Sequence, residues 1–187
     1  MKATFKPVVF TALITIATFC GVFYMSCKQD KCKAIACAYG GACNDGVCKC
    51  MPGYEGTNCE TVTASKFAGF WYVAETGTIT NHRQYPLDII ADTNATTVWI
   101  QNCYNYFPSI RATVQGDTIT IPNQQLLGKV IFGKGYLVYP SDPSNPNLPI
   151  TLTMLYEVID SVNQNMVDDF GVNAVLDHSQ ASVWTKN

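Results

Sequence analysis

Residues 32–59 read CKAIACAYGGACNDGVCKCMPGYEGTNC and contain six of the nine cysteines in the 187-residue chain. This density of cysteine is typical of a disulfide framework in an exported protein and of a metal site in a cytosolic one. About thirty residues cannot bury enough apolar surface to offset the chain entropy lost on folding, so the segment needs cross-links. The redox compartment therefore decides what these cysteines do, and the N-terminal sequence indicates that compartment.

The N-terminus has the layout of an export signal. Lys2 and Lys6 precede an uncharged, mostly apolar run over residues 8–25, which is typical of a secretory signal. The run is close to the ~20 residues that a spanning helix needs, so a retained membrane anchor is the alternative.

The end of this run resembles a bacterial lipobox. Ser26 precedes Cys27, and polar residues 28–31 follow at once, although Tyr24 and Met25 depart from the pattern. The resemblance implies a lipoprotein signal peptide over residues 1–26, lipidation of Cys27 as the mature N-terminus, and a linker over residues 27–31. Cys20 is the other candidate, but it follows Phe19.

The six-cysteine run resembles the EGF family. Its spacing is C-x4-C-x5-C-x4-C-x-C-x8-C, and residues 53–59 supply the Gly-Tyr-x-Gly-x-x-Cys ending. Spacing alone leaves 15 connectivities open. The resemblance implies an EGF-like domain over residues 32–60 with the bridges Cys32–Cys43, Cys37–Cys48 and Cys50–Cys59. Only Asp30 supplies an acidic group before the first cysteine, so we expect no calcium at this site. Zinc is not expected either, because the single residue between Cys48 and Cys50 is shorter than the usual zinc-ligand spacing. No other metal and no cofactor is predicted.

The chain from residue 66 to 187 has a different composition. It contains one cysteine, Cys103, and several segments that alternate apolar and polar residues with period two. Turn signals at residues 115–117 and 133–135 separate short strands, and residues 60–65 are predicted to be a polar link. Eight or nine such strands predict an antiparallel meander that closes into a β-barrel or sandwich.

Residues Gly69-Phe70-Trp71 look like the Gly-x-Trp opening of lipocalins, in which the Trp plugs one end of the barrel. The whole arrangement resembles short Bacteroidetes-type surface lipoproteins that join one EGF-like module to a lipocalin-like β domain. The resemblance implies anchoring in the bacterial outer membrane, with an uncleaved signal anchor or secretion as alternatives.

Composition excludes some classes of function. A formal net charge of −2 and 14% charged residues argue against a nucleic-acid partner, which needs a clustered positive face. Neither of the two histidines is part of a Ser or Cys constellation that would suggest nucleophilic catalysis, so we expect no enzyme. Asp168-Asp169 is predicted to be a solvated turn, and His82-Arg83 an exposed basic pair.

The candidate ligand anchors are Tyr104, Tyr106 and Phe107, on a predicted connection between strands. They could stack on sugar rings or hold a peptide, with packing on an edge strand as the alternative. Cys103 is predicted to be a buried free thiol.

These patterns predict a non-catalytic, lipid-anchored surface protein that binds an unknown protein, a glycan or a small apolar ligand. The alternative is a lipocalin-like carrier of a small apolar ligand, which needs an open barrel. Six residues discriminate between the two, according to whether they fill the centre or line a cavity: Trp71, Val98, Ile100, Ile119, Met154 and Tyr156.

Overall fold

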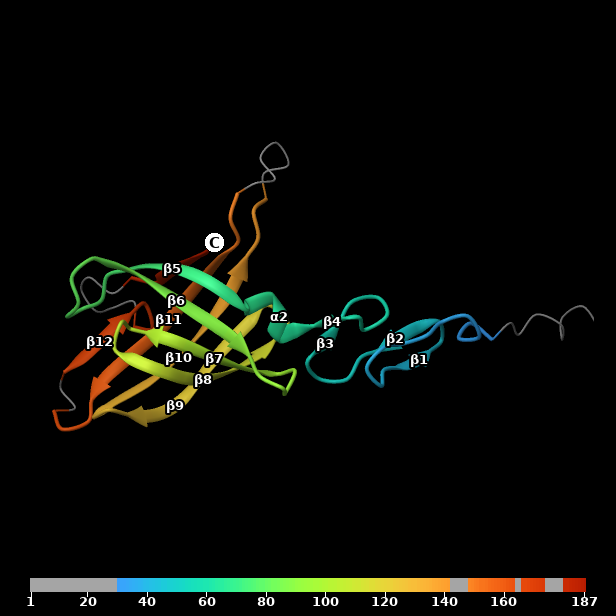
Figure 1. The fold of residues 1–187 in the computed structure, drawn as a ribbon, viewed down its shortest axis with the longest axis horizontal. Coiled ribbons are helices and arrows are strands. Elements are labelled where there is room, and N and C mark those ends of the chain that lie inside the picture. The colour runs from blue at the N-terminus through green and yellow to red at the C-terminus, as the bar shows by residue number, and fades with distance from the viewer. Residues whose placement is uncertain (1–29, 142–147, 164–165, 174–179) are drawn as a thin grey trace, which may run out of the picture.

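The computed structural model describes residues 30–141, 148–163, 166–173 and 180–187. The chain is mainly β, as predicted, and consists of a narrow N-terminal module joined to the end of a barrel (Figure 1). Cys27 and the predicted signal lie outside the described residues. The described part contains one short helix, and we find no helix in it that could span a membrane.

The N-terminal module is a small disulfide-rich unit. Disulfides join Cys32 to Cys43, Cys37 to Cys48, and Cys50 to Cys59, which is the pairing that the EGF resemblance implies. Strands β1 (Ala42–Asn44) and β2 (Val47–Lys49) form one antiparallel pair, and β3 (Tyr54–Glu55) and β4 (Thr61–Val62) form another. Gly53 and Gly56 adopt positive φ values of 88° and 98°, as expected for sharp bends beside the last bridge.

The second module is an eight-stranded antiparallel barrel. Its strands run consecutively around the wall, and the β10–β11, β11–β13 and β13–β5 pairs close it. The eight strands are β5 (Gly69–Glu75), β6 (Arg83–Ala91), β7 (Thr97–Cys103), β8 (Phe107–Gln115), β9 (Thr118–Leu126), β10 (Lys129–Val138), β11 (Thr151–Asp160) and β13 (Ser182–Lys186). A further strand, β12 (Val167–Phe170), pairs with the C-terminal half of β11, on the edge whose N-terminal half pairs with β13.

The barrel interior is filled with side chains. The six discriminating residues each expose 1% of their surface or less and belong to one apolar cluster with Phe107, Phe170 and Trp184. Water-sized space therefore does not reach any of them, and they fill the centre rather than line a cavity.

The predicted turn at residues 133–135 is wrong, because β10 runs through it without interruption. Gly133 and Gly135 lie opposite Tyr156 and Met154 on β11. A Cβ atom at Gly133 would lie 2.4 Å from the Cβ atom of Tyr156. These glycines therefore make room for large core side chains instead of turning the chain.

The predicted polar link over residues 60–65 is also wrong. Residues 61–62 form β4, and α2 (Thr63–Phe67) places Ala64 and Phe67 in the barrel core. Trp71 is buried beside this helix, and its indole N–H donates a 2.8 Å hydrogen bond to the carbonyl of Phe67. The ammonium group of Lys186, in the last strand, lies 5.4 Å from the Trp71 ring centroid. This end of the barrel is thus plugged next to the N-terminal module.

Candidate functional site

Tyr104 and Tyr106 lie on the β7–β8 connection, at the end of the barrel away from the N-terminal module (Figure 1), and Phe107, predicted to lie on the connection too, is the first residue of β8. Phe107 is completely buried, so it offers no surface to a ligand. The Tyr106 hydroxyl donates a 2.7 Å hydrogen bond to the carbonyl of Leu127 in the β9–β10 turn. Tyr104 is half-buried, with its ring 5.9 Å from that of Phe170. These rings mainly tie neighbouring connections together.

Asp168 closes the same end of the barrel. Its carboxylate accepts hydrogen bonds from the backbone N–H groups of Ile79 and Thr80, at 2.9 and 3.1 Å, and from the Tyr104 hydroxyl at 2.8 Å. Burial, and after it the Asp168 carboxylate, raises the pKa of Tyr104 to about 12. The prediction of a solvated turn at Asp168-Asp169 is wrong, because both residues are buried in β12.

A buried ion pair lies beneath this closure. Arg83 Nε donates a 2.9 Å hydrogen bond to Glu75 Oε1, and Arg83 Nη2 lies 2.7 Å from the same oxygen. Tyr156 and Ser182 donate to the other Glu75 oxygen at 2.7 and 2.8 Å. His82 is exposed as predicted, but Arg83 is not, because its guanidinium group pairs inward. The network satisfies the buried carboxylate of Glu75, so these residues stabilise the fold at this end of the barrel.

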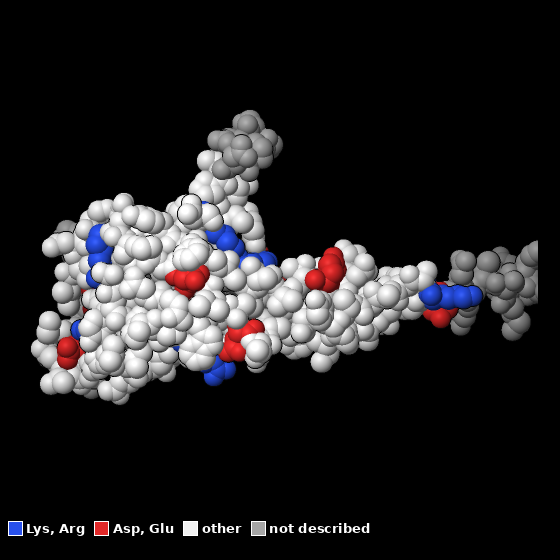
Figure 2. Space-filling model, viewed as in Figure 1, with Lys and Arg blue, Asp and Glu red and all other residues white. Residues whose placement is uncertain are grey.

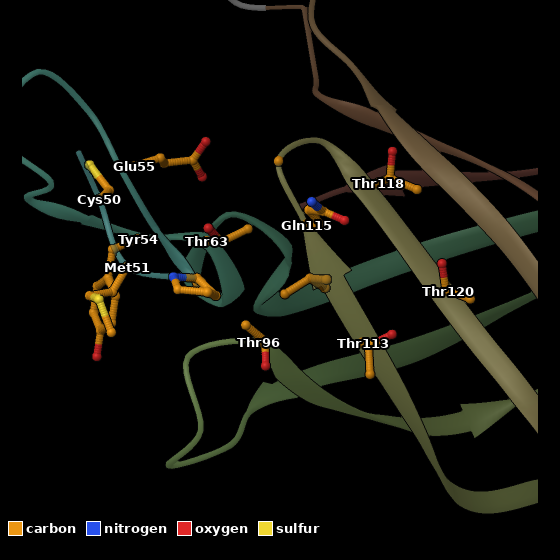
Figure 3. Close-up of a pocket in the computed structure, with 14 residues that line it drawn as sticks. Cys50, Met51, Tyr54, Glu55, Thr63, Thr96, Thr113, Gln115, Thr118 and Thr120 are labelled. Carbon is orange, nitrogen blue, oxygen red and sulfur yellow. The ribbon is translucent and has the colours of Figure 1, made fainter. Parts of the chain in front are cut away.

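A groove of about 760 Å³ lies between the N-terminal module and the outer wall of the barrel. Figure 3 shows its two sides, with Met51, Tyr54 and Glu55 on one side and the strands that carry the Thr and Gln side chains on the other. On the barrel side, Thr113 pairs in register with Thr120, and Gln115 pairs with Thr118. These four side chains point outward, because the alternate residues of β8 and β9 are buried in the core.

Close contacts hold the two sides of the groove in place. Thr63 donates a 2.8 Å backbone hydrogen bond to the carbonyl of Gly53. A Cβ atom at Gly53 would lie 2.7 Å from the Cβ atom of Ala95, so only glycine allows this approach. The N-terminal module is therefore packed directly against the β6–β7 turn.

Lys66 connects the N-terminal module to the barrel by two ion pairs. Its ammonium nitrogen lies 2.8 Å from Glu55 Oε1 and 2.6 Å from Asp117 Oδ1, and its side chain is mostly buried. Burial opposes the charge of Lys66, but the two carboxylates outweigh it and raise the pKa of Lys66. The same pair with Lys66 lowers the pKa of Asp117. The Lys66 side chain is thus held in its charged form between Glu55, which lines the groove, and Asp117.

The groove offers polar and apolar surface but no reactive pair. Five threonines, Gln115 and the N–H and C=O groups of the backbone supply donors and acceptors. Met51 is exposed, and the Tyr54 ring stacks on Tyr39 with 4.4 Å between centroids, so one side is apolar. Among the described lining residues, Glu55 alone is charged, and Lys66 already neutralises it. The arrangement fits recognition of an extended, uncharged polar ligand.

These groove residues form no functional motif in the sequence. The turn at residues 115–117 was correctly predicted, and it places Thr113 opposite Thr120. The row of threonine hydroxyl groups on the outer face of this hairpin could therefore have been predicted from the sequence. The packing of the cysteine-rich module against this row depends on contacts between segments far apart in the sequence. No local pattern signals such contacts.

Comparisons with known proteins assign no family to the chain. No protein-family model matches it, and no solved structure matches it significantly.

Proposed function

We propose that the protein is a non-catalytic surface module that binds a polar, extended ligand, such as an oligosaccharide, in the groove between its two modules. The observation that carries this proposal is the contrast between the filled barrel and the hydroxyl-lined groove. A few placed donors and acceptors orient a polar ligand, and apolar side chains, here the half-buried Tyr54 and the exposed Met51, supply contact area. No nucleophile or free acid–base pair accompanies them among the described lining residues.

The groove can be tested by filling it. Thr113→Trp places an indole over the Thr120 side of the groove without touching the core, because Thr113 is exposed. Thr153→Trp is the matched control, since Thr153 lies on the outer face of β11, away from the groove. The full chain is screened on glycan and peptide arrays, and hits are measured by titration calorimetry.

We expect the Thr113→Trp variant to lose at least tenfold in affinity for a bound glycan, which is about 1.4 kcal/mol, while the control keeps it. Equal binding by all three proteins would exclude the groove. If the wild type binds peptides but no glycan, the proposed binding function stands and the proposed ligand class, an oligosaccharide, is wrong.

The carrier alternative has less support. It needs apolar space at the centre of the barrel, and the six discriminating residues leave none there. A second depression, of about 540 Å³, lies on the outside of β9–β11 and is lined in part by Phe132, Leu155 and Val172. It is an open surface feature, so it does not enclose a ligand as a carrier requires.

We also propose that the protein is anchored in the bacterial outer membrane by a lipid on Cys27. Several acyl chains on one residue would give stable anchoring, because each buried CH2 contributes roughly 0.8 kcal/mol. Labelled palmitate supplied to a Gram-negative expression host should enter the wild type and not the Cys27→Ala variant. Loss of label in Cys20→Ala alone would move the site, and equal labelling of all variants would exclude it.

A further inference from the structure

The outer wall formed by β5, β6, β7 and β8, called here the β5–β8 face, exposes several large apolar side chains. Phe70 and Tyr72 on β5 are 65% and 55% exposed, Ile90 on β6 is 47% exposed, and Trp99 on β7 is 38% exposed. Ile90 and Trp99 are partners in register. Side chains paired in this way lie about 5 Å apart, so the two form one contiguous surface.

Two charged residues on this face have no partner. Arg111 on β8 is opposite Trp99, and Asp88 on β6 is opposite both Phe70 and Gln101. Neither side chain forms an ion pair or a hydrogen bond with any residue in the described part of the chain. Figure 2, with this face toward the viewer, shows a mostly uncharged surface with a few scattered charged groups.

Trp99 is held in position between these charges. Its indole N–H donates a 2.8 Å hydrogen bond to Asp92 Oδ2 in the β6–β7 turn. That bond is the largest cause that lowers the pKa of Asp92, so the acceptor is ionised at neutral pH. A fixed indole loses little conformational entropy on association, which favours its use in an interface.

We propose that a second copy of this chain covers the β5–β8 face in a two-fold symmetric dimer, with Arg111 of each copy paired to Asp88 of the other around Trp99. Exposed aromatic residues and Arg, with few other charges, are the composition of protein interfaces. A two-fold interface presents the same patch twice, so the patch must complement itself. One unpaired cation and one unpaired carboxylate on either side of an apolar centre meet that condition. The inference does not rest on the proposed function.

Charge reversal gives the sharpest test. The full chain is purified in detergent, and its dimer dissociation constant is measured by sedimentation equilibrium over a concentration series. Arg111→Asp and Asp88→Arg should each raise the constant at least tenfold, because each places like charges together twice per dimer. The double variant restores both pairs and should return the constant to within about threefold of the wild type.

Two further variants separate the interface from general effects. Trp99→Ala should raise the dissociation constant about 30-fold, as the loss of a central anchor does. Lys134→Asp should leave it unchanged, since Lys134 is exposed on β10, outside the face. A wild type that stays monomeric throughout would overturn the proposal and leave the face to a different protein. A dimer that none of the face variants weakens, or that the double variant fails to restore, would overturn it too.

Discussion

Glu157 and Asp169 bring two carboxyl groups together where β11 pairs with β12. The two residues are partners in register. Asp169 is completely buried, and its carboxylate accepts hydrogen bonds from the backbone N–H groups of Val172 and Asn173. Burial, followed by the hydrogen bond and the charge of Asp169, raises the pKa of Glu157 above its ordinary value of 4.5. Glu157 is therefore stabilised in its protonated form by the fold.

This residue-scale arrangement predicts how stability depends on pH. Because the pKa of Glu157 is higher in the folded state than in the unfolded state, its contribution is fully present below the unfolded-state value. It is lost as the pH rises through the raised folded-state value. The free energy of unfolding of the wild type, relative to Glu157→Gln, should thus fall as the pH rises above 4.5.

Urea unfolding at a series of pH values measures this difference, with Asp160→Asn as a control of opposite sign. Backbone N–H groups of Asn163 and Val162 lower the pKa of Asp160, so its contribution is lost on acidification instead. A difference between wild type and Glu157→Gln that does not change with pH would contradict the prediction.

At the scale of the strand, β10 shows how the barrel is filled. Gly133 faces inward, and a Cβ atom there would lie 2.4 Å from both the Leu155 carbonyl oxygen and the Tyr156 Cβ atom. Gly133→Ala should therefore lower the free energy of unfolding by about 3 kcal/mol or more, because a packed strand cannot move away. Lys134→Ala, exposed on the same strand, should change it by less than about 0.5 kcal/mol. Thermal and urea unfolding would measure both, and equal stability of the two variants would show that β10 can shift.

Strands β10, β11 and β12 show what the sequence could and could not reveal. The alternation of residues 151–158 predicted β11 and its inward face, since period two is a local property. Gly133-Lys134-Gly135 has the composition of a turn. The segment is part of a continuous strand because it pairs with Tyr156 and Met154 in β11. Asp168 was misjudged for a similar reason, because its partners Ile79 and Thr80 lie almost ninety residues away. Local patterns gave the strands, while packing between distant segments decided these exceptions and the groove.

At the scale of the whole molecule, the two modules are stabilised by different means. Within residues 32–59 only Cys59 is buried, so the N-terminal module has almost no apolar core. Its three bridges close loops of about ten residues, and each contributes on the order of 2–3 kcal/mol. The barrel has an apolar cluster that extends from Ala64 to Trp184, and its free cysteine, Cys103, is buried as predicted. A reductant therefore has a target in the N-terminal module and none in the described part of the barrel.

Reduction should thus unfold residues 32–59 and leave the barrel folded. Hydrogen exchange measured by mass spectrometry, with and without reductant, should show rapid exchange over residues 32–59 and unchanged protection in β5–β11. At the junction, the amide of Thr63 should lose protection, because its acceptor is the carbonyl of Gly53 in the reduced module. Lys66 should keep its pair with Asp117, since both residues belong to the barrel side, and lose only Glu55. If protection disappears from β5–β11 at the same time as from residues 32–59, the modules form one cooperative unit, and the contacts at Gly53 and Lys66 stabilise the barrel as well as the groove.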